Sequence, residues 1–291
     1  MRLLVFPFLL LGFATPAVPR QEQPRPLVIL VHGRGQLGSD SAAMRREWKN
    51  ELDGALGAQG FPKLRDEEVA LAWYADVVDP GAVAACDQPR RPDEAGIAEF
   101  ARGFLVSLAS VMPDSGRASD LQARSLLGDA LYVMDPSTRC AAETRFGNLV
   151  KKARAAGRPV IVVAYSLGAV VAYEWLDRAS DSSAVQLITL GSPLGVPVAR
   201  EILTGNMGAL RIPQSVSRWV NIYDADDAFA APLGLGATRA LDRVAKSDRD
   251  YDPHRVNRYL RDAETGSALG AALCAAAGDA WSPKCAGLRS P

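Results

Sequence analysis

Several residue types that mark common protein classes are scarce in this chain of 291 residues. It has only two histidines, and none of its four cysteines stands in a Cys-x-x-Cys spacing, so the sequence offers no zinc-binding pattern. Neither sign of charge is in excess, because 33 Lys and Arg residues balance 33 Asp and Glu residues. Such a balance gives no strong attraction to nucleic acid or to an anionic membrane. We therefore expect no metal site and no nucleic-acid partner.

The sequence also lacks a hydrophobic run of the roughly 20 residues that a membrane-spanning helix needs. A shorter apolar run at residues 3–13 follows Arg2 and precedes the small residues of 14–17. This order is typical of a cleavable signal peptide, and a buried N-terminal strand is the alternative. We expect residues 1–17 to be removed and residues 18–26 to form a Pro-rich leader. The prediction is a secreted or periplasmic protein without a transmembrane anchor.

The four cysteines fit export to an oxidising compartment. They are Cys86, Cys140, Cys274 and Cys285. An even number of cysteines in an exported chain favours disulfides, and four cysteines allow three pairings. We favour Cys86–Cys140 and Cys274–Cys285, with free buried thiols as the alternative.

Predicted strands and helices alternate along the chain. Apolar runs predict strands at 27–31, 69–78, 160–164, 185–190 and 218–223, and amphipathic stretches predict helices at 44–59, 118–132, 142–156, 167–179 and 253–262. This alternation favours an α/β fold, a doubly wound and mostly parallel sheet with helices on both faces. We expect one domain over residues 27–291, with a helical cap insertion at 80–140 and an Ala-rich tail at 264–291.

The strongest chemical signal is the segment Ala164–Gly168, which joins the most hydrophobic predicted strand to a helix. A serine at a sharp strand-to-helix turn presents its hydroxyl away from the sheet, and the turn needs small neighbours such as Ala164 and Gly168. We predict Ser166 as a nucleophile and the Leu167 N–H as an oxyanion donor. A plain helix N-cap serine is the alternative.

A glycine-rich loop follows the first predicted strand, with the sequence His32, Gly33, Arg34 and Gly35. Because ligands bind beyond the carboxyl ends of the strands in such a sheet, this loop is expected near Ser166. Its glycines allow a second N–H, that of Arg34, to face the oxyanion. A turn that needs positive φ is the simpler interpretation of the same glycines.

An acid and a base complete the predicted constellation. Three aspartates close the strand that ends near residue 223, and we choose Asp227 as the acid, with Asp224 as the alternative. His32 belongs to the glycine loop, which leaves His254 as the general base. The order Ser166, Asp227, His254 is the one expected for a nucleophile at a strand-to-helix turn of this architecture.

Four segments of the sequence form a recognisable set: the HGRG loop, the AYSLG turn, LGSPLG and WVNIYDADD. In this order they resemble the α/β-hydrolase superfamily, in particular its lipase- and esterase-like branch, over about residues 27–262. Two positions depart from the common pattern, since Ala164 stands where Gly is commoner and Tyr165 where His is frequent. The resemblance implies a serine hydrolase that uses Ser166, Asp227 and His254 and needs no cofactor.

The predicted activity is hydrolysis of a carboxylic ester, in a small molecule or a lipid, through an acyl-enzyme. The same residues allow an acyltransferase or a thioesterase, which product analysis with a competing alcohol would distinguish. A non-catalytic exported binding protein of the same fold is the alternative from another class. A fluorophosphonate probe would label Ser166 only in the active enzyme.

Overall fold

The computed structural model describes residues 24–34, 36, 38–77, 132, 136–179, 184–196, 210–235, 240–246 and 252–288. The predicted signal peptide therefore lies outside the described residues, together with Gly35 and Cys86. Of the predicted cap at residues 80–140, the structure describes Tyr132 and the beginning of one helix.

Six strands form one parallel sheet, which places the chain in the α/β class, as predicted. Their bounds are β1 (Leu27–Val31), β2 (Val69–Ala72), β3 (Val160–Tyr165), β4 (Val185–Leu190), β5 (Val216–Tyr223) and β6 (Ala240–Val244). Their order across the sheet is β2-β1-β3-β4-β5-β6, and every neighbouring pair is parallel. The hydrophobic β3 lies near the centre of the sheet, flanked by β1 and β4.

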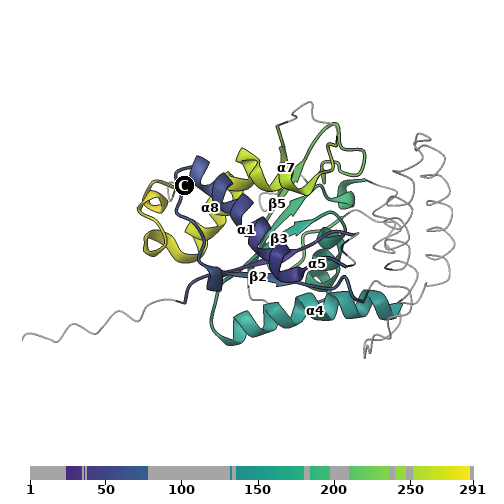
Figure 1. The fold of residues 1–291 in the computed structure, drawn as a ribbon. Helices are drawn as coiled ribbons and strands as arrows, with labels where there is room; N and C mark the ends of the chain where they lie inside the picture. Colours follow the sequence, from purple (N-terminus) through teal and green to yellow (C-terminus); the bar gives the residue numbers. More distant parts are fainter. Residues whose placement is uncertain are drawn as a thin grey trace, which may run out of the picture.

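Helices connect the strands and cover the sheet (Figure 1). The α-helices are α1 (Ser41–Ala58), α4 (Pro136–Ala155), α5 (Leu167–Arg178), α7 (Val256–Arg261) and α8 (Ala263–Ala277). Short 3-10 turns are η1 (Asp66–Glu68), η2 (Pro193–Gly195), η3 (Gly278–Ala280) and η4 (Pro283–Leu288). Helix α1 packs against α7 and α8, whereas α4 packs against α5.

The alternation of side chains along each strand divides the core into two halves. In β1, Leu27, Ile29 and Val31 belong to the cluster that includes residues of α4 and α5. Val28 and Leu30 belong to the cluster that includes residues of α1, α7 and α8. Since both faces of the sheet are covered, β1 and β3 are continuous apolar runs rather than alternating ones.

Some element bounds differ from the sequence prediction. Strand β2 ends at Ala72, well before the predicted end at residue 78, and α4 begins at Pro136, where a break was predicted. Proline is tolerated in the first helical turn because its missing N–H needs no partner there. Strand β6 precedes His254, in a region where no strand was predicted.

The alanine-rich end of the chain is part of the folded domain. It forms α8 and two 3-10 turns, and the predicted disulfide Cys274–Cys285 joins them. Cys140 is also disulfide-bonded, and its predicted partner Cys86 lies outside the described residues. Among the helices that the structure describes, none is both long and apolar enough to cross a membrane.

Candidate active site

The carboxyl ends of the parallel strands bring the predicted residues to one edge of the sheet. His32 follows β1, Ser166 follows β3, and Asp224 and Asp227 follow β5. His254 lies in the turn just before α7. Because parallel strands end at the same edge, segments far apart in sequence meet there.

Ser166 has an unusual backbone conformation. Its φ of 53° and ψ of −125° make it the only non-glycine residue with positive φ in the described part of the chain. Such a conformation costs about 1–3 kcal/mol and persists only where the surroundings hold it. Here the Ser166 N–H donates to Leu190 O at 2.9 Å, and its carbonyl accepts from Ala169 N–H at 2.9 Å. The strained turn is therefore anchored to β4 and to the start of α5.

Two glycines let the loop after β1 press against this turn. A Cβ atom on Gly168 would lie 2.4 Å from the carbonyl oxygens of Val31 and His32. A Cβ atom on Gly33 would lie 3.1 Å from Ser166 Cβ. The structure gives Gly33 no positive φ, so close approach rather than turn geometry explains this glycine.

The structure brings the three predicted triad residues into one hydrogen-bonded path. Ser166 Oγ lies 2.9 Å from His254 Nε2, and His254 Nδ1 lies 2.7 Å from Asp227 Oδ2. Because an ionised carboxylate only accepts, Nδ1 carries the hydrogen and Nε2 accepts from the serine hydroxyl. This is the arrangement that lets an imidazole remove a proton from a serine.

The aspartate that contacts His254 is Asp227, the predicted acid, and not the alternative Asp224. Asp224 Oδ1 accepts from the Asp226 N–H at 2.9 Å, a turn-stabilising contact, and Oδ2 lies 3.4 Å from the Arg258 guanidinium. Asp227 is buried, and its Oδ1 accepts the Phe229 N–H at 2.9 Å. The two carboxylates therefore have different structural roles at the end of β5.

Two tyrosines without a predicted role contact the triad residues. The Tyr259 hydroxyl donates to Asp227 Oδ2 at 2.6 Å, and the Tyr165 hydroxyl donates to the carbonyl oxygen of His254. Burial and the neighbouring Asp227 raise the pKa of both phenols, so both remain protonated donors. The position of Tyr165 next to Ser166 was the one sequence signal available for either residue.

His32 is held as a neutral side chain beneath the glycine loop. Its Nδ1 donates to Gly33 O at 2.6 Å, and its Nε2 accepts the Tyr74 N–H at 3.2 Å. Burial lowers the pKa of His32 to about 4, and its ring stacks on that of Tyr74 at 4.0 Å. With both ring nitrogens occupied, His32 supports the loop and is no rival to His254 as a base.

The two predicted oxyanion donors lie in different segments of the chain. Leu167 is the first residue of α5, where a helix leaves its N–H groups without intrahelical acceptors. Arg34 lies in the loop after β1, and its guanidinium carbon lies 5.0 Å from the centre of the Phe229 ring. The direction of the Arg34 N–H stays a prediction.

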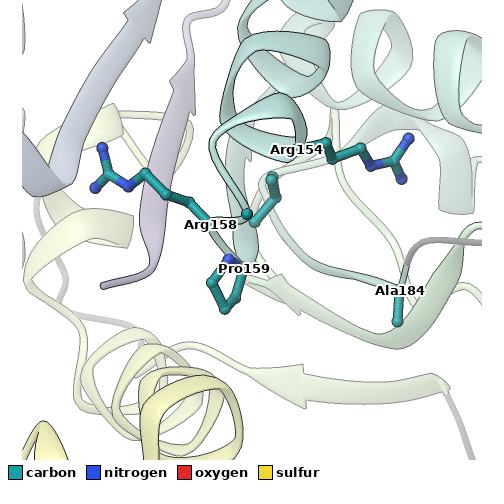
Figure 2. A pocket seen from close by; sticks show the side chains of 6 residues that line it. Arg154, Arg158, Pro159 and Ala184 are labelled. Carbon is teal, nitrogen blue, oxygen red and sulfur yellow. The ribbon is translucent and has the colours of Figure 1, made fainter. Parts of the chain in front are cut away.

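A pocket lies at the opposite edge of the sheet, before β3 and β4. It has a volume of about 280 Å³ and is lined by Arg154, Gly157, Arg158, Pro159, Val160 and Ala184. Figure 2 shows the side chains of Arg154 and Arg158 pointing away from each other on either side of Pro159. The Arg158 guanidinium donates to the carbonyl oxygens of Arg25, Pro26 and Glu67, each at 2.9 Å. These bonds give Arg158 a structural role.

No family model matches this sequence, and no curated protein matches it significantly. Within the described residues, no group of three or more His, Cys, Asp or Glu side chains is arranged to hold a metal ion.

Proposed function

We propose that this chain is a serine hydrolase of the α/β-hydrolase superfamily, and that it cleaves carboxylic esters of small molecules or lipids. The observation that carries the proposal is the hydrogen-bonded path from Ser166 through His254 to Asp227. A strained serine between a buried strand and a helix adds support, because this turn directs the hydroxyl away from the sheet. The parallel sheet with both faces covered suits the same superfamily.

In the first half of the reaction, Ser166 Oγ attacks the ester carbonyl carbon while its proton moves to His254 Nε2. The carbonyl electrons move to the oxygen, and the N–H groups of Leu167 and Arg34 stabilise that oxyanion. Asp227 stabilises the protonated imidazole, since its Oδ2 lies 2.7 Å from Nδ1. The carbonyl then reforms, and the alkoxide leaves with the proton from Nε2 as an alcohol.

In the second half, a water molecule replaces the alcohol. His254 removes one proton from the water, whose oxygen attacks the acyl carbon bound to Ser166. Collapse of the second tetrahedral intermediate breaks the acyl bond to Oγ, which recovers its proton from Nε2. One ester bond and one water molecule become one acid and one alcohol, and the enzyme returns to its starting state.

The decisive experiment is the Ser166→Ala variant, assayed for hydrolysis of p-nitrophenyl esters of graded acyl length. We expect turnover to fall ~10⁴-fold or more, because loss of a triad nucleophile removes most of the catalysis. A fluorophosphonate probe should label the wild type and leave Ser166→Ala unlabelled.

Ser217→Ala is the matched control. The Ser217 hydroxyl donates to Val185 O at 3.2 Å, at the opposite end of β5 from Asp227, so this variant should keep its activity and labelling. An inactive, unlabelled wild type would refute the proposal, and so would full turnover in Ser166→Ala.

We also propose that the protein is exported and that residues 80–140 form a cap over the site. The disulfide Cys274–Cys285 supports export, because disulfides persist in oxidising compartments. The position of the insertion supports the cap, because it follows β2, whose carboxyl end lies at the same edge of the sheet as Ser166. Mass spectrometry of the mature protein should find a new N-terminus near residue 18, and an intact Met1 would contradict export.

A further inference from the structure

The phenol of Tyr259 links the acid of the candidate triad to α7. Tyr259 is buried, and its hydroxyl oxygen accepts the Asp224 N–H at 3.0 Å. Because an N–H already occupies the oxygen as an acceptor, the single phenolic hydrogen is directed to Asp227 Oδ2 at 2.6 Å. Both hydrogen-bonding functions of the hydroxyl are thus used within the site.

The oxygen that Tyr259 contacts is the same one that contacts the imidazole. Asp227 Oδ2 accepts hydrogen bonds from the Tyr259 hydroxyl at 2.6 Å and from His254 Nδ1 at 2.7 Å. The other oxygen, Oδ1, accepts the Phe229 N–H at 2.9 Å. Hydrogen bonds to a carboxylate stabilise its charged form and draw charge toward the donor. The phenol therefore shares the negative charge that His254 would otherwise meet alone.

A glycine at the end of β4 makes room for this arrangement. Gly191 has a φ of 54°, and a Cβ atom there would lie 2.9 Å from Tyr259 Cε2 and 3.4 Å from Asp227 Oδ2. Any larger side chain would separate the ring from the carboxylate or strain the backbone. The contact between Tyr259 and Asp227 thus depends on a glycine of the LGSPLG segment.

We propose that Tyr259 is a positioning residue of this site, which fixes Asp227 and tunes how readily His254 takes up a proton. The inference rests on the proposed function, since it concerns the acid and base of that mechanism. The phenol does not touch the reacting atoms and acts through Asp227. Its removal leaves more negative charge on Oδ2, which stabilises the protonated imidazole and delays its deprotonation to higher pH.

Other charged and titratable groups surround His254 and are chemically the same in every variant at position 259. Asp252 Oδ1 accepts the His254 N–H at 3.0 Å, and the Tyr165 hydroxyl from β3 donates to the His254 carbonyl. Arg258 from α7 pairs with Asp224, and the Arg34 guanidinium lies over the Phe229 ring, whose centre is 5.0 Å from that of His254. The comparison of variants at position 259 therefore isolates the phenol.

The test follows the ring signals of the two histidines by NMR through a pH titration, together with the pH profile of kcat/KM. In Tyr259→Phe the protonation midpoint of His254 should move to higher pH by roughly half a unit or more, and the acidic limb of kcat/KM should move with it. We expect kcat to fall about 10-fold. Tyr173→Phe, another buried tyrosine that packs on Trp219, is the matched control and should leave midpoint and profile unchanged.

Site-specific replacement of Tyr259 by 3-fluorotyrosine supplies the opposite change while keeping the ring and the hydroxyl. A stronger phenolic donor should move the His254 midpoint to lower pH. An unchanged midpoint in both Tyr259 variants would overturn the inference, even if activity fell, because a purely structural role predicts loss of activity alone. The NMR titration needs no turnover, so an inactive wild type would refute the proposed function without deciding the role of Tyr259.

Discussion

The two histidines of the chain have opposite surroundings, although both carry their hydrogen on Nδ1. His254 is partly exposed, and its Nδ1 faces the Asp227 carboxylate at 2.7 Å. His32 is buried, bonds a carbonyl and an N–H, and stacks on Tyr74. Protonation of His32 Nε2 would place two donors against each other, because the Tyr74 N–H already points at that atom. His32 therefore stays neutral where it is buried.

This difference predicts a loss of stability in mild acid. Burial lowers the pKa of His32 from 6.5 to about 4, so the unfolded chain takes up a proton in a range where the folded state does not. The contribution of His32 is complete above pH 6.5 and is lost as the pH falls toward 4. We expect the free energy of unfolding, measured by urea denaturation, to fall by up to about 3 kcal/mol over this range.

The variant His32→Gln separates this effect from other titrations. A glutamine offers a donor and an acceptor but does not titrate, so its unfolding free energy should lack the His32 part of the decrease. His254→Gln is the control and should retain that part. An equal decrease in His32→Gln and in the wild type would show that other groups cause it.

At the scale of elements, glycines of α8 allow this helix to lie close to α1. A Cβ atom on Gly266 of α8 would lie 2.3 Å from the carbonyl oxygen of Ala55 in α1. A Cβ atom on Gly270 would lie 2.1 Å from the Phe61 ring, which follows α1. These approaches hold α8 against α1, and α8 continues directly from the helix that carries Tyr259. The packing of the last long helix therefore supports the edge that bears the candidate site.

We predict that Gly266→Ala destabilises the protein by about 1–3 kcal/mol, because the added methyl group forces the two helix backbones apart. The measurement is the midpoint and slope of urea unfolding. Gly54→Ala in α1 is the matched control, since a Cβ atom there meets nothing within 4 Å. That variant should stabilise the protein by about 0.5–1 kcal/mol, as alanine favours a helix over glycine. A neutral Gly266→Ala would show that α8 shifts without cost.

The sequence predicted those elements whose burial leaves a clear pattern. The bounds of β1 and β4 agree with prediction, because most residues of these two strands are apolar and buried. Strand β6 escaped prediction because it lies at the edge of the sheet, where only Ala240 of its five residues is buried. Edge strands carry polar side chains and so resemble loops in sequence.

The residues of the candidate site also differ in how far the sequence predicts them. The order of Ser166, Asp227 and His254 along the chain was sufficient to predict that they meet, because each follows a local motif or is one of few residues of its type. The contact of Tyr259 with Asp227 was not predicted, since no local pattern marks it. It depends on the placement of α7 against β4 and β5, which tertiary packing alone determines.

At the scale of the whole molecule, the C-terminal segment closes the face of the sheet that α1 covers. The Gln186 side chain of β4 donates to Ala272 O in α8 at 2.9 Å. Trp281 packs on Phe61 with ring centres 5.4 Å apart, and the Lys284 ammonium contacts both the Phe61 ring and Gln59 O. The predicted Ala-rich tail therefore contributes to the core, and its last turns wrap the end of α1.

We expect the disulfide Cys274–Cys285 to stabilise the packing of the C-terminal segment against α1. It joins α8 to the last 3-10 turn across a separation of 11 residues, and Cys285 is buried. Cross-linking a loop of that size limits the unfolded chain and stabilises a domain by about 2–3 kcal/mol. The free energy of unfolding of the double variant C274A/C285A, measured by urea denaturation under non-reducing conditions, should be lower by that amount.

The exposed neighbours Ala275 and Ala286 provide the control, because changing both to serine should alter stability by less than about 0.5 kcal/mol. Equal stability of C274A/C285A and the wild type would mean that the last turns can detach from α1 without weakening the sheet.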